Sequence, residues 1–242
     1  MNVSNDVTAA MLTERFFGQG GPNMLFVRIE RGIGSAILLS DTPVIGELHA
    51  AGEIGHISID LDGPLCPCGK RGCLETMISG TALKKQLSAA DVEQHQNILA
   101  RAGRYLGQAL SMPVGLLDMA DVCVYGQPNI INETFIDAAQ QYLDAATSSS
   151  FHKHTVIRRC ECGPDITVQG EAIAVVFQHL AKIKLATPAT KRARPSAAQH
   201  DIKRYRTAWK MRSRRQIRRL IFHAPALCQC YAAMAAPMAP TG

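Results

Sequence analysis

One histidine and three cysteines, spaced His-x9-Cys-x-Cys-x4-Cys, constrain this chain more than any other feature of its sequence. They are His56, Cys66, Cys68 and Cys73. Imidazole and thiolate ligands suit a tetrahedral zinc ion, and Gly69 and Gly72 allow the chain to bend sharply between the last two cysteines. Four protein ligands leave no position for an activated water, so we expect a structural zinc ion rather than a hydrolytic one.

The other cysteines and the N-terminus bear on whether the motif binds metal. Two further close pairs occur, Cys160/Cys162 and Cys228/Cys230. The N-terminus does not resemble a secretory signal, and no run of eighteen apolar residues predicts a membrane span. We therefore expect a cytoplasmic protein without a membrane partner, in which disulfides are rare. The alternative to a metal site is three incidental cysteines in a loop.

Charge divides the chain into two parts. Residues 1–181 hold 12 Lys and Arg against 19 Asp and Glu, a net charge of −7. Residues 182–242 hold 14 Lys and Arg and one acid, a net charge of +13, and are rich in Ala and Pro without a core pattern. We predict a globular domain over 1–181 and a basic, disordered tail over 182–242. A basic segment can also contact nucleic acid, and Trp209 stands among these basic residues.

The first part is typical of an α/β domain. Asn5 and Asp6 offer N-cap side chains to a helix that ends at Gly18. Apolar runs on either side of Gly32 and Gly34 predict a β-hairpin turned at those glycines. The remaining pattern predicts a loop at 42–52, helices at about 76–89, 91–112, 113–119, 133–146 and 166–180, and strands at 122–125 and 154–159.

The segment around the zinc motif carries a family resemblance. Gly52-Glu53-Ile54-Gly55-His56, followed by Cys66-Pro67-Cys68-Gly69-x-x-Gly72-Cys73-Leu74-Glu75, resembles the signature of the ROK family. That family comprises bacterial sugar kinases and sugar-responsive transcriptional repressors. The resemblance covers roughly residues 3–181. It implies an actin-like, hexokinase-type α/β fold with a zinc-binding loop, and a hexose or amino sugar bound in a cleft. We also expect a homo-oligomer.

The resemblance also implies a set of sugar-binding residues, whose carboxylates and amides can pair with several hydroxyls at once. They are Asn5, Asp6, Glu53, His56 and Glu75. Asp6 matches the general base of the family's kinases, which takes the proton from the sugar hydroxyl that attacks the γ-phosphate. His56 is expected to bind metal with one ring nitrogen and face the sugar with the other. Taken by themselves, Asn5 and Asp6 are better explained by plain helix capping.

Two departures from the kinase pattern favour a regulator. Only five residues precede Asp6, so we expect an N-terminally incomplete fold without the family's first phosphate loop, on which phosphoryl transfer depends. Gly126-Gln127-Pro128 follows the strand at 122–125, where kinases usually carry Gly-Gly, and a bulky Gln hinders close approach of a nucleotide. Gly32 and Gly34 resemble a second phosphate loop, although a hairpin turn accounts for them as well.

These observations predict the effector-binding part of a sugar-responsive ROK-family transcriptional regulator. No helix-turn-helix is visible, so DNA is expected to be contacted only through a missing N-terminal domain. The alternative is an ATP-dependent kinase of glucose, an N-acetylhexosamine or fructose, with Asp6 as catalytic base and ATP and Mg²⁺ as cofactors. A third possibility is a remnant that neither folds stably nor binds.

A second metal site is sterically feasible. His152 and His154, and likewise Cys160 and Cys162, are two residues apart, and alternate residues of a strand share one face. The alternative is a polar strand with incidental cysteines.

Overall fold

The structure of the chain, a computed structural model, describes residues 5–147 and 154–175. The chain divides into two units, Met1–Ala186 and Thr187–Gly242, and all described residues belong to the first. The predicted domain boundary after residue 181 and the basic tail with Trp209 lie outside the described residues.

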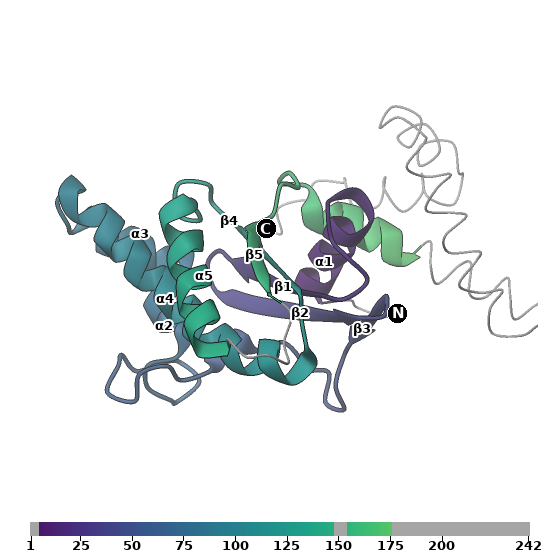
Figure 1. Ribbon diagram of the computed structural model, residues 1–242, viewed down its shortest axis with the longest axis horizontal. Helices are drawn as coiled ribbons and strands as arrows, with labels where there is room; N and C mark the ends of the chain where they lie inside the picture. The colour runs from purple at the N-terminus through teal and green to yellow at the C-terminus, as the bar shows by residue number, and fades with distance from the viewer. Residues whose placement is uncertain (1–4, 148–153, 176–242) are drawn as a thin grey trace, which may run out of the picture. The chain divides into compact units, whose positions relative to one another are not determined.

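A five-stranded mixed sheet forms the centre of the first unit (Figure 1). Its strands are β1 (Met24–Ile29), β2 (Ile33–Leu39), β3 (Thr42–Val44), β4 (Asp121–Gly126) and β5 (Val156–Arg159), in the order β3-β2-β1-β4-β5. The first three strands form an antiparallel meander, whereas β1, β4 and β5 run parallel. The predicted hairpin and both predicted later strands are therefore present.

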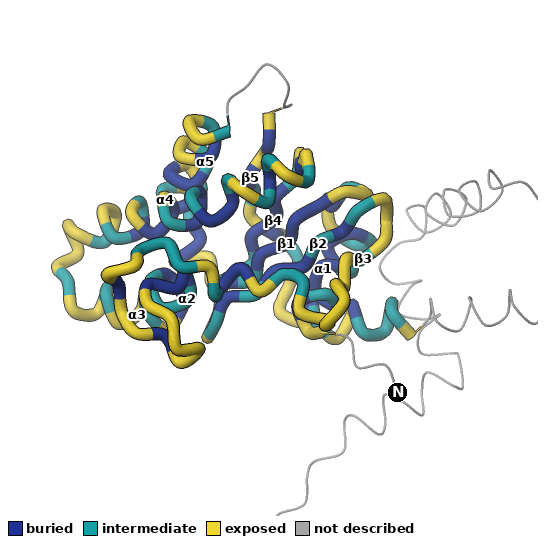
Figure 2. The backbone as a smooth tube through the Cα atoms, turned by 90° about the horizontal axis from the view of Figure 1, so that it is seen from below, coloured by how far each residue is buried: buried dark blue, intermediate teal, exposed yellow. Residues whose placement is uncertain are grey.

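Helices cover both faces of the sheet (Figure 1). They are α1 (Asp6–Phe17), the 3₁₀ turn η1 (Ile54–His56), α2 (Leu74–Ile78), α3 (Gly80–Ser88), α4 (Val92–Leu117), α5 (Glu133–Thr147) and a helical segment at 166–175. Alternate strand residues serve the two sides: Val27 and Val124 join the core under α2 to α5, whereas Phe26 and Cys123 join the core under α1. In Figure 2 the central strands β1 and β4 are mostly coloured as buried, together with parts of the helices that pack on them. Among the described helices, none has the length and apolarity to cross a membrane.

The segment from Asn5 to Leu39 folds as predicted except at one glycine. Asn5 caps α1, its side-chain oxygen accepting from the Val7 N–H at 2.9 Å. The hairpin turns at Glu30, Arg31 and Gly32, because the last strand pair is Ile29 with Ile33. Gly34 was expected in this turn, yet it lies inside β2. A Cβ there would come within 2.9 Å of the Val7 side chain, so this glycine allows α1 to pack on the strand.

Three predicted boundaries differ from the structure. The predicted loop at 42–52 begins with β3, which pairs with β2 at the sheet edge. The predicted helix at 76–89 is two helices, because Ser79 is extended and its hydroxyl caps Ala82 at 3.2 Å. The predicted break after residue 112 is absent: α4 continues through Pro113, and Val114 beyond it is buried in the core. Packing here outweighs the hydrogen bond that proline cannot donate.

Helices α4 and α5 cross with their backbones close together. A Cβ at Gly107 would come within 2.6 Å of the Ala139 carbonyl oxygen, and one at Gly103 would clash with the Phe135 carbonyl oxygen. Gly115 lies on the same helix, and a Cβ there would meet nothing within 4 Å. An alanine at Gly103 would add both a steric clash and the helix propensity of alanine, whereas an alanine at Gly115 would add only the helix propensity.

We expect Gly103→Ala to lower the free energy of unfolding by roughly 1–3 kcal/mol, because the added methyl forces the helices apart. Gly115→Ala should instead raise it by about 0.5–1 kcal/mol, since alanine favours the helix. Denaturant unfolding of the full chain measures both changes. Equal stability of the two variants would mean that α4 and α5 do not approach each other as described.

Candidate functional site

The loop between η1 and α2 gathers the four predicted metal ligands. His56 Nδ1 lies 3.7 Å from Cys66 Sγ, and Cys68 Sγ lies 3.6 Å from Cys73 Sγ. All four donor atoms lie within 4.8 Å of one another. Two sulfur ligands around a tetrahedral ion with bonds of about 2.3 Å stand about 3.8 Å apart. The cluster could therefore hold one metal ion with little movement of its ligands.

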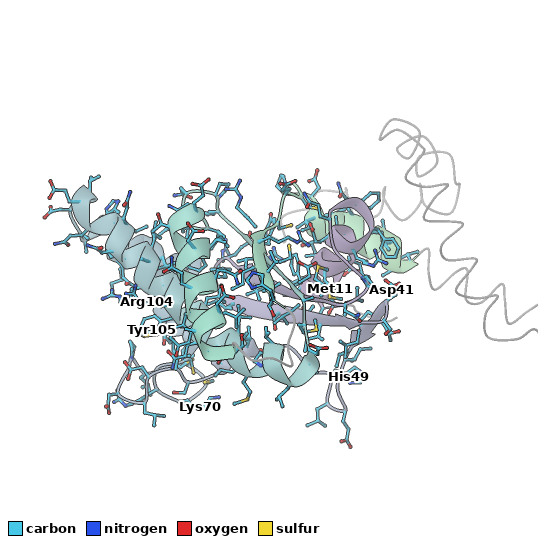
Figure 3. All side chains as sticks on the ribbon, in the orientation of Figure 1. Met11, Asp41, His49, Lys70, Arg104 and Tyr105 are labelled. Carbon is cyan, nitrogen blue, oxygen red and sulfur yellow. The ribbon has the colours of Figure 1, made fainter. Side chains whose placement is uncertain are left out.

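Tight backbone turns bring these ligands together. Gly72 has a φ of 57°, and a Cβ there would clash with the Asp60 carbonyl oxygen, so only glycine fits. The Cys66 N–H donates to the Lys70 carbonyl at 2.7 Å, which closes the turn between Cys66 and Cys73. The Lys70 ammonium donates to the His56 carbonyl at 2.6 Å and so ties the turn to η1 (Lys70 is labelled in Figure 3).

The electrostatics of the cluster differ from one cysteine to the next. A hydrogen bond from the Lys70 backbone lowers the pKa of the exposed Cys68 thiol to about 7. Burial, reinforced by the neighbouring thiols, raises the pKa of Cys73 to about 12. Several thiolates crowded together repel one another unless a cation offsets their charge, and metal ligation deprotonates thiols outright. The donor set therefore suits a bound cation better than three free thiolates.

The beginning of β2 joins the segments that carry the predicted sugar-binding residues. Glu75 Oε2 accepts from the Ile33 N–H at 2.9 Å. The Gly52 carbonyl accepts from the Ser35 N–H at 2.9 Å and from its hydroxyl at 2.8 Å. Gly34 lies against Val7, in the first turn of α1. The start of α1, the segment before η1 and the start of α2 thus all pack on residues 32–35.

The five predicted sugar-binding side chains are engaged to different degrees. Asn5 caps α1, and Glu75 supports the start of β2. His56 directs Nδ1 toward Cys66. Glu53 is exposed immediately before η1. Asp6 is exposed, and its carboxylate accepts from the Arg28 guanidinium at 3.0 Å.

Arg28 contacts a predicted site residue, Asp6, and was not predicted from the sequence. It also donates to Glu30 Oε2 at 2.6 Å and to the Thr167 hydroxyl at 3.2 Å, and it lies over the Tyr125 ring. The available signal was a single charged residue in the otherwise apolar strand Met24–Ile29. Glu30, in the hairpin turn, was missed as well. Between them, Asp6 and Glu30 present two carboxylates to one guanidinium.

The turn after β4 contains Gly126, Gln127 and Pro128, where the family's kinases usually carry two glycines. A Cβ at Gly126 would come within 2.7 Å of the Ile29 carbonyl oxygen, so this glycine serves the packing of the sheet. Gln127 is exposed, and its carbonyl accepts from the N–H groups of Ile130 and Ile131 at 2.9 and 2.8 Å. Gln127 therefore occupies a well-defined turn at the end of a parallel strand.

A second cluster of possible metal ligands forms, but its members differ from the four residues suggested by the sequence, His152, His154, Cys160 and Cys162. Cys160 and Cys162 gather around Glu14, which the sequence did not predict as a ligand. His154 instead lies 3.4 Å from Asp144, and His152 lies outside the described residues. Burial alone raises the pKa of Glu14, but hydrogen bonds from Cys160 and Arg158 outweigh it and hold the pKa below its ordinary value.

Comparison with known proteins identifies the family. The sequence profile of the ROK family matches residues 1–172. The chain belongs to the ROK family. The predicted actin-like, hexokinase-type fold is confirmed by solved structures. A ROK hexokinase from Thermus thermophilus is 27% identical with a TM-score of 0.59, over 70% of this chain and 65% of that one. A ROK family transcriptional regulator, a homolog of the E. coli MLC protein, is 25% identical with a TM-score of 0.62. The match covers 70% of this chain and 50% of the regulator.

Curated relatives are similar over a shorter stretch. An N-acetylmannosamine kinase of Vibrio cholerae serotype O1 is 38% identical over 100 residues, which is 40% of this chain and 34% of the relative. An N-acetylmannosamine kinase of Yersinia pestis is 38% identical over 114 residues, which is 43% of this chain and 39% of that relative. This chain therefore spans less than two fifths of the length of these relatives. Family membership covers both kinases and regulators.

We expect Cys68→Ser to lose one metal equivalent per chain relative to the unmodified protein. Cys68 is exposed, so the change removes one of four ligands without opening a cavity. Elemental analysis after dialysis against a chelator measures the loss. Asp62→Asn, an exposed acid of the same loop, is the matched control and should retain the full metal content. A Cys68→Ser protein with unchanged metal content would contradict the site.

Proposed function

We propose that this chain is the sugar-binding part of a ROK-family transcriptional regulator and that it carries a structural zinc ion. A hexose or amino sugar is the proposed effector, and Asn5, Asp6, Glu53, His56 and Glu75 are its proposed ligands. DNA binding is proposed for a helix-turn-helix domain outside the described residues. The observation that carries the choice of regulator over kinase is the ion pair between Asp6 and Arg28.

Zinc is the proposed metal because the donors are one imidazole and three thiols. Borderline-soft Zn²⁺ prefers this set and a tetrahedral arrangement. When bound, it supplies positive charge and cross-links η1 to α2. With Nδ1 of His56 directed toward the metal, Nε2 can contact a sugar hydroxyl. Glu75 follows the metal ligand Cys73 by two residues, so metal ligation would also orient this proposed sugar ligand.

The ion pair bears on phosphoryl transfer. A general base must reach the sugar hydroxyl with a carboxylate oxygen able to accept its proton, and Arg28 holds one of the two Asp6 carboxylate oxygens at 3.0 Å. Glu30 adds a second carboxylate at the hairpin turn that pairs with the same guanidinium, so the positive charge of Arg28 is already offset and is not left to hold a phosphate. Sugar recognition needs neither a free base nor a phosphate site, so both features are compatible with a regulator.

An ATP-dependent sugar kinase is the second candidate. The observation that favours it is the 38% identity to N-acetylmannosamine kinases. In that case Asp6 would act as the base, which requires Arg28 to release it, and ATP with Mg²⁺ would bind near the hairpin turn and the turn at Gln127.

We expect no sugar-dependent release of ADP from ATP and Mg²⁺ with glucose, fructose, N-acetylglucosamine or N-acetylmannosamine. The rate of the full chain should equal that of Asp6→Asn, because Asp6 is paired with Arg28. A coupled ADP assay makes the comparison. Turnover that requires a sugar and disappears in Asp6→Asn would replace the regulator by the kinase.

We expect the same sugars, tested without ATP, to give calorimetric binding by at least one of them. Glu53→Ala should weaken that binding about tenfold or more, since a hydrogen bond to a charged group contributes about 1.5–3 kcal/mol. Glu47→Ala, an exposed acid of the preceding loop, should bind as the unmodified chain does. If none of the sugars binds, the proposed sugar-binding function is wrong. If Glu53→Ala binds sugar as tightly as the unmodified chain, the assignment of Glu53 as a sugar ligand is wrong.

A further inference from the structure

A second group of metal-ligating side chains lies where α1 packs against the end of β5. Glu14 Oε2 is 3.1 Å from Cys160 Sγ and 3.2 Å from Cys162 Sγ. These donor atoms all lie within 4.8 Å of one another. Glu14 is 1% exposed, although it is an acidic residue, and Cys160 is 8% exposed. We propose that Glu14, Cys160 and Cys162 form a second site for a thiophilic divalent cation such as Zn²⁺ or Cd²⁺.

The carboxylate of Glu14 is oriented before any cation arrives. Its Oε1 accepts from Arg158 Nη1 at 2.7 Å and from the Gln19 N–H at 3.0 Å. Arg158 is fixed in turn by Asp121, to whose two oxygens it donates at 2.8 and 3.0 Å. Oε2 is thereby directed toward the two thiols. Metal ligands are commonly positioned by hydrogen bonds of this kind to their other atoms.

Strand geometry places both sulfurs on the same side of the chain. The Cys160 N–H donates to the Val124 carbonyl at 2.8 Å, which extends the pairing of β5 with β4 by one residue. Residues two apart in an extended segment face the same way, so Cys162 joins Cys160 at Glu14. Glu161 between them is exposed, and its Oε2 accepts from Gln19 Nε2 at 3.1 Å.

Distances and charge both suit a divalent ion. Around a tetrahedral ion with bonds of about 2.3 Å to sulfur and 2.0 Å to oxygen, sulfur and oxygen ligands stand about 3.5 Å apart. The observed 3.1 and 3.2 Å therefore need only a slight expansion. A divalent cation that displaces one proton from each thiol leaves the net charge of the buried group unchanged. Half-buried Cys162 gives solvent a route to the site.

The site differs from the first cluster in its chemistry. It offers two thiols and a carboxylate in place of three thiols and an imidazole, and three protein ligands in place of four. A bound ion would link the second half of α1 to the end of β5. We expect weaker binding than at His56, Cys66, Cys68 and Cys73, so that the second site fills after the first.

Cadmium titration of the full chain tests the proposal. Cys228 and Cys230 are first replaced by serine, so that binding reports the remaining cysteines. The reduced, metal-free protein is then titrated with Cd²⁺, followed by the ultraviolet thiolate-to-metal band and by elemental analysis. We expect two equivalents for this parent protein and one equivalent for Cys160→Ser or Cys162→Ser. Glu161→Gln is the matched control, with two equivalents.

Two results would overturn the second site. One is saturation of the parent protein at a single equivalent that Cys160→Ser retains, and the other is retention of two equivalents in both cysteine variants. Cys162→Ser keeps a hydroxyl that can donate to Glu14 at a half-buried position, so this variant should fold. Circular dichroism and the unfolding midpoint of the metal-free variant confirm that a lost equivalent reflects lost ligation.

Discussion

The first residues of β2 hold the proposed sugar site together through close backbone packing. The Ile33 N–H donates to Glu75, the Ser35 N–H donates to the Gly52 carbonyl, and Gly34 admits the side chain of Val7. Each contact joins this strand to a different segment of the chain. Because the contacts involve backbone groups and glycines, their geometry leaves little freedom for larger side chains. The loop that carries Cys66, Cys68 and Cys73 and the helix α1 are positioned by the same short stretch.

The parts of the fold predicted from sequence are those with strong local signals. Asn5 and Gly18 mark both ends of α1, and the apolar runs around Gly32 predict the hairpin. The ligand spacing from His56 to Cys73 predicts a cluster that the structure brings within metal-binding distance. These signals lie within a few residues of the features they predict, so no knowledge of the tertiary structure is needed.

The features that were missed depend on contacts between distant segments. Pro113 suggests a helix end, but the burial of Val114 keeps α4 continuous. Glu14 lies 146 residues before Cys160, so no local pattern links the two. Arg28 meets Asp6 only because β1 passes beside the start of α1. For Arg28, a single charged residue in an otherwise apolar strand is the local hint, but its partner cannot be read from the sequence.

Two arginines of the sheet tie α1 down by ion pairs, Arg158 to Glu14 in its second half and Arg28 to Asp6 at its start. The first pair is buried on the glutamate side, whereas Asp6 is largely exposed. A ligand that needs the Asp6 oxygen held by Arg28 must therefore compete with that arginine. Dissolved salt screens an exposed pair far more than a buried one. A rise in ionic strength should therefore weaken the ion pair between Asp6 and Arg28 while the buried pair between Glu14 and Arg158 continues to hold the second half of α1.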